Sequence, residues 1–520
     1  MGKILYDIRG SSMKAYQEFS DYIAQISDIL NAMNVLNWDA RTQMPVGGNA
    51  TRGNQLATLS GLAQEKLISD RLQRLLESAE TETSSLPEDG IVRRNLQAVR
   101  EASELFRRTP ERLTRDLAEL RNLAQQRWGE ARASSDFALF APVLERMVVL
   151  QQELAEVIGY TEHPYDALVG LYEPGMTHSS LQVLFEQLKI GSLPLLERIK
   201  AAKPPRHDFL KREFPLEQQR MFGLEVARAF GYDLERGRLD VSLHPFEISF
   251  TRNDVRITTR YQSDFLTMSL FGTLHETGHA LYEQGVAPEL TRSALTSDLP
   301  GLYAVGGTSF GTHESQSRLW ENLVGRSFSF WAHWYPRLQE IFPAQLEDVN
   351  LETFYRSVNR VAPSLIRVEA DEITYNLHIM LRASLEAALI DGSLQVSELP
   401  EAWNAKMLEY LGLTPPDDAR GVLQDIHWSA GYFGSFPTYT IGNVMAAQFY
   451  QAAQKQISDL ERTLELGDYA PLRGWLTKHI YQHGRRFSPH ELLTRATNQG
   501  LNATAYLEYL EEKFTRLYAL

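Results

Sequence analysis

The stretch Leu270-Phe-Gly-Thr-Leu-His275-Glu276-Thr-Gly-His279-Ala-Leu-Tyr282 carries two histidines four residues apart. On an α-helix, residues at this spacing lie on one face, one turn from each other. Neutral imidazoles in that arrangement can bind one zinc ion together. Glu276, directly after the first histidine, can take a proton from a water that the metal polarises. The stretch therefore predicts a metal-binding helix, buried through its apolar residues: Leu270, Phe271, Leu274, Ala280 and Leu281.

A third ligand must distinguish this hypothesis from a buried helix that has two surface-facing histidines and no metal. Glu283 follows His279 by one turn, but from the same helix it would have to bend back to reach the metal. Glu314 opens a separate predicted helix that could cross the first. We therefore favour Glu314 as the third ligand and expect Glu283 to be a solvated or supporting carboxylate. His313, next to Glu314, is an alternative ligand on spacing alone.

The composition limits the class of protein and the kind of metal site. The 520 residues are 43% hydrophobic and 23% charged, which is typical of soluble globular proteins. A net charge of −14 argues against nucleic acid or an anionic membrane as the main partner. Without cysteine, a metal must be bound by His, Asp, Glu or water, and a reducing cytoplasm is the expected compartment. We find no secretory signal and no long apolar run, so we expect no membrane span.

The pattern of apolar residues predicts a mainly α-helical protein, because most of the chain repeats at three- and four-residue steps. Residues 243–261 differ, since β-branched and aromatic residues flank a turn signal at Asn253-Asp254 and predict a hairpin. The hairpin could pair with an extended peptide along a cleft, or it could form a small structural sheet. Ser488-Pro489-His-Glu491 resembles a capping box. Helices are expected at 13–36, 52–80, 91–132, 137–160, 179–202, 215–231, 351–359 and 364–390, and a turn at 36–48.

Several motifs together resemble the thermostable carboxypeptidase family, the M32 metallocarboxypeptidases of the carboxypeptidase Taq type. One such motif would be a weak signal, whereas six in the expected order are very specific. Segments near Trp38 and Pro174 also resemble the family, so the resemblance spans nearly the whole chain. The six motifs are His244-Pro-Phe246, Asp254-Val-Arg-Ile-Thr258, His275-Glu-Thr-Gly-His279, His313-Glu-Ser-Gln316, Ile366-Arg-Val-Glu-Ala-Asp371 and Gly421-Val-Leu-Gln-Asp-Ile-His-Trp428.

The resemblance implies a function and a set of site residues. It implies zinc bound by His275, His279 and Glu314, Glu276 as the general base, and cobalt as a possible substitute for zinc. It implies a homodimeric enzyme that releases single C-terminal amino acids from peptides with a free C-terminus, with broad specificity. The implied fold is similar to neurolysin and angiotensin-converting enzyme: residues 1–520 form a single catalytic domain, mainly α-helical, with two helical lobes around a deep groove and one small β-sheet.

Two segments depart from the family pattern. Residues 291–305, between the metal ligands, are longer than is usual, and Ser435 stands where an aromatic residue is expected. Both affect the expected groove and leave the expected chemistry unchanged.

The aromatic loop after position 427 supplies candidates for stabilising the developing oxyanion, which needs donors besides the metal. Tyr439 and His427 are the expected donors, because both side chains can donate a hydrogen bond and both fall in this loop. Tyr432 is the reserve candidate. The alternative for Tyr439 is a core aromatic residue with a satisfied hydroxyl group.

A carboxypeptidase must also bind the free carboxylate of its substrate, and arginine suits this task because its planar fork binds carboxylate at two points. Arg367 is our first choice, since it lies in a family-like motif, and Arg256 in the hairpin is second. A structural ion pair with Asp254 is the alternative for Arg256. We expect Asp371 and Glu369 to orient Arg367 or a zinc histidine. His244, in another family-like motif, and Tyr432, in the aromatic loop, complete the expected substrate-binding set.

Two other functions remain possible from the residues alone. An endo-acting oligopeptidase, or an enzyme that releases dipeptides, would use the same metal site. A helical binding protein with a structural zinc is the non-enzymatic alternative, but structural zinc usually has four protein ligands, and Glu276 in this position serves hydrolysis.

Overall fold

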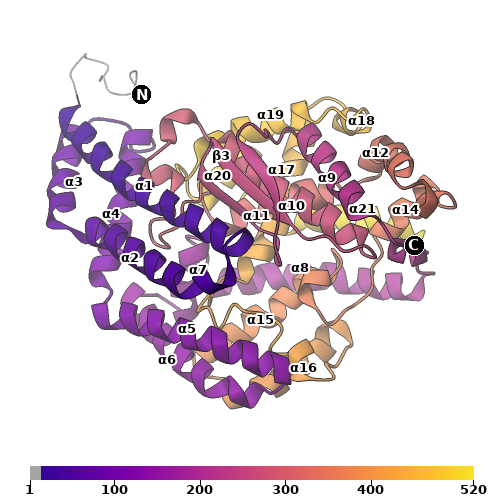
Figure 1. Cartoon of the computed structure of the whole chain (residues 1–520), viewed down its shortest axis with the longest axis horizontal. Coiled ribbons are helices and arrows are strands. Elements are labelled where there is room, and N and C mark those ends of the chain that lie inside the picture. Colours follow the sequence, from indigo (N-terminus) through magenta and orange to yellow (C-terminus); the bar gives the residue numbers. More distant parts are fainter. Residues whose placement is uncertain (1–12) are drawn as a thin grey trace. The chain divides into compact units, whose positions relative to one another are not determined.

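The computed structural model describes residues 13–520 and is mainly α-helical, as predicted (Figure 1). The N-terminal residues on which the absence of a secretory signal was judged lie outside the described part. None of the helices in residues 13–520 is both long and apolar enough to cross a membrane. The helices are α1 Lys14–Thr42, α2 Asn49–Ile68, α3 Asp70–Glu82, α4 Ile91–Arg108, α5 Glu111–Ser134, α6 Ala141–Ile158, α7 Pro164–Tyr172, α8 His178–Ala201, α9 Leu216–Phe230, α10 Leu266–Gly285, α11 Phe310–Arg318, α12 Phe328–Ile341, α13 Pro343–Leu346, α14 Leu351–Val358, α15 Tyr375–Ile390, α16 Leu399–Leu411, α17 Pro437–Gln456, α18 Leu460–Glu465, α19 Ala470–His479, α20 Pro489–Thr497 and α21 Thr504–Tyr518.

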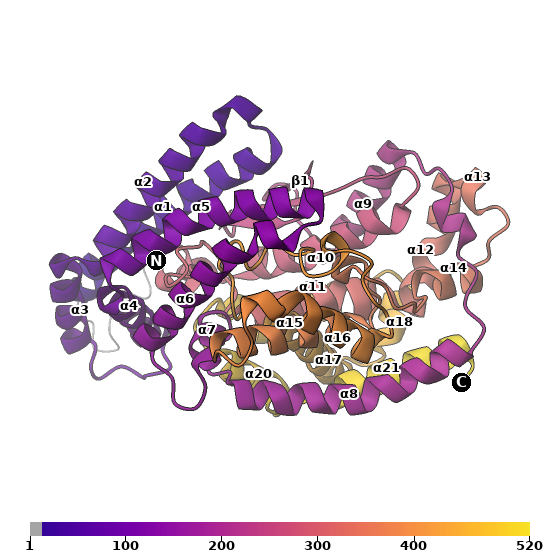
Figure 2. The ribbon, with the colours of Figure 1, turned by 90° about the horizontal axis from the view of Figure 1, so that it is seen from below.

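Contacts divide the chain into two compact units, each built from separated segments. The first contains the chain up to Arg107 together with Asp208–Tyr355 and Phe449–Gly500. The second contains Arg108–His207, Arg356–Gln448 and Leu501–Leu520. In the second unit, α8 and α21 lie side by side although the sequence separates them widely (Figure 2). The prediction of a single catalytic domain around a groove stays a prediction.

The predicted hairpin is confirmed, and a third strand joins it. Strands β2 (Glu247–Thr251) and β3 (Asp254–Thr259) pair antiparallel across a two-residue turn. Strand β1 (Gly237–Val241) pairs parallel with β3, which gives the order β1-β3-β2. Strand β1 was not predicted, because it is short and half-exposed and lacks the apolar alternation that identifies a strand.

Helix α10 carries the stretch with the two histidines, and it is buried as predicted. The five apolar residues named above are all buried on it. The helix packs against α9, against β2 and β3, and against α11. The same packing that removes its apolar residues from water therefore fixes the histidines relative to α11.

Gly278 on α10 sets how closely α11 approaches. A Cβ atom at this position would lie 2.6 Å from Ser317 Cα and closer still to the carbonyl oxygen of Gln316. Backbone atoms cannot move aside as a flexible side chain can. A residue larger than glycine would therefore force α10 and α11 apart, and α11 is the helix that carries Glu314.

Two predictions of local structure are wrong at their boundaries. Helix α1 continues through Thr42, into the turn expected at 36–48, because the chain-breaking Pro45 comes only after it and Trp38 is buried. Residues 364–374 form no α-helix, only a short 3-10 turn at Arg367–Glu369, and α15 begins at Tyr375. The carboxylate of Asp371 accepts hydrogen bonds from the backbone N–H groups of Ala362, Ile373 and Thr374, which stabilises a loop instead.

Other boundaries follow the sequence signals. Residues 52–80 form two helices separated at Ser69, whose hydroxyl group caps α3. The stretch expected as one helix at 91–132 is divided at Pro110 into α4 and α5, since proline disfavours a helical conformation in the residue before it. The capping box at Ser488 is confirmed, because Ser488 and Glu491 exchange side chain–backbone hydrogen bonds at the start of α20.

Gly278→Ala tests the close approach of the two helices. We expect it to lower stability by about 1–3 kcal/mol, as overpacking does, and to lower metal affinity because α11 moves away. Gly272→Ala, on the same helix, is the matched control, since its Cβ would meet its nearest neighbour at 3.6 Å. Thermal unfolding and chelator competition measure the two effects. If both variants behave alike, the close approach does not constrain the centre.

Candidate metal centre

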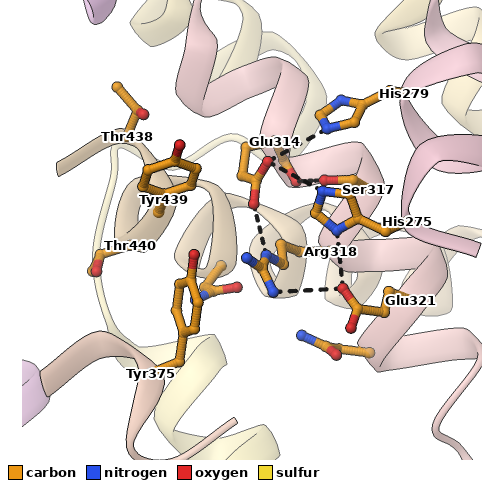
Figure 3. Close-up of polar contacts among 12 residues, drawn as sticks. His275, His279, Glu314, Ser317, Arg318, Glu321, Tyr375, Thr438, Tyr439 and Thr440 are labelled. Carbon is orange, nitrogen blue, oxygen red and sulfur yellow. Dashed lines mark hydrogen bonds and ion pairs between the residues drawn. The ribbon is translucent and has the colours of Figure 1, made fainter. Parts of the chain in front are cut away.

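Three side chains of the first unit converge at the C-terminal half of α10 (Figure 3). His275 Nε2 lies 3.6 Å and His279 Nε2 lies 3.4 Å from Glu314 Oε2. Ligand atoms bonded at about 2.0–2.2 Å to one tetrahedral ion stand at about this separation from each other. The side chains can therefore hold a metal together without rearrangement, and they are those favoured from the sequence.

A row of charged residues after Glu314 supports these side chains. His275 Nδ1–H donates to Glu321 Oε2 at 2.9 Å, and Arg318 Nε–H donates to Glu314 Oε1 at 2.7 Å. Each contact uses the atom that faces away from the convergence point and so fixes the ring or carboxylate (Figure 3). Asp371 and Glu369 were expected to orient a zinc histidine or Arg367. Asp371 is instead bonded to its own loop.

The supporting residues could have been found from their spacing. Arg318 and Glu321 follow Glu314 by four and seven residues, which places all three on one helix face. Glu321 lies in the π-helical segment Leu319–Val324 that continues α11. Such widened turns often occur at functional sites.

The local charges favour the ionisation states that metal binding needs for Glu314 and His279, but not for His275, from which the metal must displace a proton more readily held. Burial opposes the ionised form of Glu314, but Arg318 and the two histidines outweigh it and lower its pKa. Burial, assisted by His313, lowers the pKa of His279 to about 3, so this ring is neutral. Burial also lowers the pKa of His275, but Glu314 and Glu321 outweigh it and the net pKa is raised.

Glu276 is buried beside this centre, with 6% of its surface exposed. Burial is the main cause that raises the pKa of its carboxyl group to about 7, and the negative charge of Glu314 adds to it. The positive charges of His275 and Arg41 oppose the rise. A carboxyl group with such a pKa can both accept and return a proton near neutral pH.

Glu283 and His313, the other candidate ligands, belong to a separate group. Glu283 is buried rather than solvated, and its carboxylate contacts His313 Nε2 at 2.8 Å. Together with Glu247 these residues form a second cluster of metal-ligand type. His313 therefore has its ring nitrogen engaged by Glu283 and is not part of the group formed by His275, His279 and Glu314.

In the second unit, Arg367 is held by a carboxylate that the sequence analysis did not select. Its Nε and Nη2 donate to Asp425 Oδ1 at 3.0 and 2.8 Å, and its Nη1 donates to the Tyr375 hydroxyl at 3.1 Å. Asp425 also accepts from Arg382 Nε at 2.7 Å. Asp425, and not Asp371 or Glu369, therefore orients Arg367.

His427 and Tyr439 lie in contact with each other in the same unit. His427 Nε2 is 3.1 Å from the Tyr439 hydroxyl oxygen, and its ring stacks on Phe436 at 4.3 Å. Burial, with the charge of Arg367, lowers the pKa of His427 to about 3, so the ring is neutral. Tyr439 stands in the first turn of α17 rather than in the aromatic loop. The reserve candidate Tyr432 is 37% exposed.

Arg256 forms an ion pair with Asp254, which was the structural alternative to substrate binding for this residue. Its Nε and Nη2 donate to the two carboxylate oxygens of Asp254 at 2.9 Å each. Its guanidinium group also lies over the rings of Trp38 and Phe250. Neither of these contacts of Arg256 requires a substrate.

His244, another predicted substrate-binding residue, is exposed in the segment before β2.

Comparison with known proteins identifies the family. The family model for the carboxypeptidase Taq (M32) metallopeptidases matches residues 18–514. The chain belongs to this family. Thermostable carboxypeptidase 1 of Thermus thermophilus is 44% identical to this M32 chain over 517 residues, which cover 97% of it and 99% of the relative. Carboxypeptidase 1 of Bacillus subtilis is 38% identical, with 97% and 99% covered.

Solved structures agree with this assignment. The M32 carboxypeptidase of Deinococcus radiodurans has a TM-score of 0.93 and 40% identity, covering 98% of this chain and 100% of that one. Metallocarboxypeptidase 1 of Trypanosoma cruzi has a TM-score of 0.89 and 34% identity, with the same coverage. The predicted family and the mainly helical fold are confirmed, and the chain is a metallocarboxypeptidase.

One buried carboxyl group of the M32 chain had no role in the sequence analysis. Glu386 on α15 accepts hydrogen bonds from the Tyr165 hydroxyl (2.6 Å), Trp428 Nε1 (2.9 Å) and the Gly434 backbone N–H (3.0 Å). It thereby connects α15 to α7 and to the aromatic loop. Burial raises its pKa to about 7, although these three donors oppose the rise. A glutamate within the apolar run of a predicted helix was the feature of the sequence that could have identified this buried carboxyl group.

Glu386 should make stability fall as the pH rises. The folded protein keeps this proton up to about pH 7, whereas the unfolded chain releases it near the ordinary pKa of 4.5. The protonated carboxyl group adds about 3 kcal/mol to the free energy of unfolding below about pH 4.5. This contribution is lost as the pH rises through 7. Urea unfolding at several pH values should show a smaller fall in stability for Glu386→Gln than for the wild type, since Glu276, whose pKa is also about 7, still contributes in the variant. Equal slopes would contradict the raised pKa.

Proposed function

We propose that this metallocarboxypeptidase is a zinc enzyme that releases single C-terminal amino acids from peptides, and that His275, His279 and Glu314 bind the metal. The observation that carries the proposal is the convergence of two imidazole nitrogens and one carboxylate oxygen at 3.4–3.6 Å. Two histidines and one carboxylate are the usual protein ligands of a hydrolytic zinc ion, and they leave a coordination position open. Cobalt, which accepts the same donors, is the alternative metal.

Metal analysis and a timed digest test this proposal. The purified protein should bind about one zinc ion per chain, and chelation should abolish hydrolysis until zinc or cobalt is returned. Mass spectrometry of a digested peptide should show successive loss of single residues. Loss of two residues at a time, or internal cuts, would contradict the proposed mode of cleavage, and an active metal-free protein would contradict the metal.

The chemistry follows from what the side chains can do. A bound zinc ion supplies polarisation of the scissile carbonyl group and of the attacking water. Glu276 accepts a proton from that water and passes it to the leaving amine. Its pKa of about 7 suits both steps, since a base with a much lower pKa would be a poor proton acceptor.

Glu276→Gln separates the general base from the metal ligands. We expect this variant to retain its metal, because His275, His279 and Glu314 are unchanged, and to lose nearly all activity. A loss of about 10²-fold or more in kcat is the size that general base catalysis contributes. Metal content and peptide hydrolysis are measured on the same preparation. Joint loss of metal and activity, or persistent activity, would show that Glu276 has another role.

The cluster around Arg367 suits recognition of the substrate carboxylate. Two buried guanidinium groups, Arg367 and Arg382, share a single carboxylate, Asp425, so the cluster carries a surplus of positive charge. Of the five N–H groups of Arg367, three are used by Asp425 and Tyr375. Two N–H groups, one on each terminal nitrogen, are left for a further acceptor, and arginine can use such a pair to bind a carboxylate at two points.

His427 and Tyr439 are the proposed donors to the oxyanion that develops on the scissile carbonyl group. The neutral His427 ring carries one N–H group and Tyr439 one O–H group, and the two side chains lie 3.1 Å apart, so both types of donor stand in one place. Tyr432 remains the reserve donor, and His244 and Arg256 the further substrate-binding residues. We also propose that the enzyme is a cytoplasmic homodimer and that its two lobes form one catalytic domain.

Arg367→Ala tests the carboxylate anchor. We expect kcat/KM on a free-acid peptide to fall by about 10²-fold or more, since misplacing the scissile bond by about 1 Å already costs this much. Zinc should stay bound. An amidated peptide should be a poor substrate for the wild type and change little in the variant. Arg256→Ala serves as the comparison, with a smaller effect expected because Asp254 pairs with Arg256 one to one, whereas two guanidinium groups share Asp425. Full activity of Arg367→Ala would exclude it as the anchor.

A further inference from the structure

The two histidines of the metal centre are supported in different ways. His275 Nδ1 bonds to Glu321, which fixes the orientation of its ring. His279 Nδ1 is buried and has no hydrogen-bond partner within residues 13–520. A metal-binding histidine normally has its second ring nitrogen bonded, and that bond determines the plane of the ring. Something other than a hydrogen bond must therefore fix the ring of His279.

The ring of His313 lies against that of His279. Their centroids are 4.4 Å apart and their planes differ by 16°, which is a stacked arrangement. Tyr282 also stacks on His313, at 5.5 Å and 28°, and Tyr481 stacks on Tyr282 at 5.2 Å and 28°. His279 thus ends a chain of stacked rings that is packed into the first unit.

Glu283 and two glycines fix His313 in this position. The Glu283 carboxylate contacts His313 Nε2 at 2.8 Å and accepts the Gly306 backbone N–H at 2.8 and 3.0 Å. A Cβ atom at Gly306 would lie 2.5 Å from Glu283 Oε2, and one at Gly307 would lie 2.7 Å from His313 Cδ2. A larger residue at either position would therefore displace Glu283 or His313 from its place in this pair.

We infer that His313, held by Glu283, is a positioning residue that fixes the ring of His279 by stacking and so raises the affinity of the centre for its metal. The inference rests on the proposed role of His279 as a metal ligand. It explains why a buried histidine with an engaged nitrogen stands next to Glu314 in the sequence without joining the metal-binding group. It also assigns a role to Glu283, whose carboxylate holds the ring of His313 in place.

The experiment measures metal binding without any peptide. Zinc affinity of the full-length protein is determined by competition with a chromogenic chelator, and the visible spectrum of the cobalt-loaded protein reports the ligand geometry. His313→Ala should weaken zinc binding by about 10- to 100-fold, the usual effect of losing such a supporting residue, and should change the cobalt spectrum. His313→Phe, which keeps a flat ring, should restore much of the affinity. Glu283→Ala should fall between the wild type and His313→Ala.

Controls separate positioning from general damage and from direct ligation. His479→Ala removes another stacked histidine of the same unit, 4.6 Å from the Trp475 ring, and should leave zinc affinity unchanged. Glu314→Ala, which removes a proposed ligand, should weaken binding more than any of the His313 variants, and melting temperatures show whether each variant is folded. Wild-type affinity and cobalt spectrum in folded His313→Ala would overturn the inference, as would equal losses in His313→Phe and His313→Ala. Failure of the wild type to bind zinc would instead refute the proposed ligands.

Discussion

The contact of α10 with α11 at Gly278 is the constraint on which the metal centre depends. His275 and His279 come from one helix and Glu314 from the other, so their separation is set by how closely the two backbones approach. Helices packed through ordinary side chains have their axes about 8–10 Å apart. Glycine at the crossing removes the side chain that would otherwise stand between α10 and the backbone at Gln316 and Ser317. The short distances between the ligand atoms are therefore a consequence of helix packing.

Burial of the centre imposes a second condition, because each buried charge must be balanced. Glu314 and Glu321 are paired with Arg318 and the histidines, and their pKa values fall accordingly, to about 2 for Glu321. Glu276 differs, since burial prevails over its positive neighbours. Carboxyl groups within one small region thus have very different proton affinities. That difference suits some of them to metal binding and Glu276 to proton transfer.

The features predicted correctly from the sequence were those that local geometry determines. The spacing of His275 and His279 fixes their common face on any helix, and the hairpin followed from its turn and its β-branched residues. Glu321 and Asp425 were missed because their importance comes from the partners that they meet, His275 in one unit and Arg367 in the other. Strand β1 was missed because its pairing with β3, not its own pattern, makes it a strand. The helix expected over 364–374 failed because a side chain of the loop itself, Asp371, satisfied the backbone.

The distribution of the functional side chains along the chain explains why so much was visible. Each unit combines three separated segments, yet the metal-binding residues and their supports fall within 275–321, and the Arg367 cluster falls within 367–439. A short continuous segment can be recognised by its residue types and spacing, and packing then needs only to hold it. Tyr481 shows the limit of this approach. It joins the stacked rings behind His279 from a distant segment, and nothing in the sequence around it connects it to the metal-binding stretch. Residues of this kind become visible only when the fold shows which side chains lie against one another.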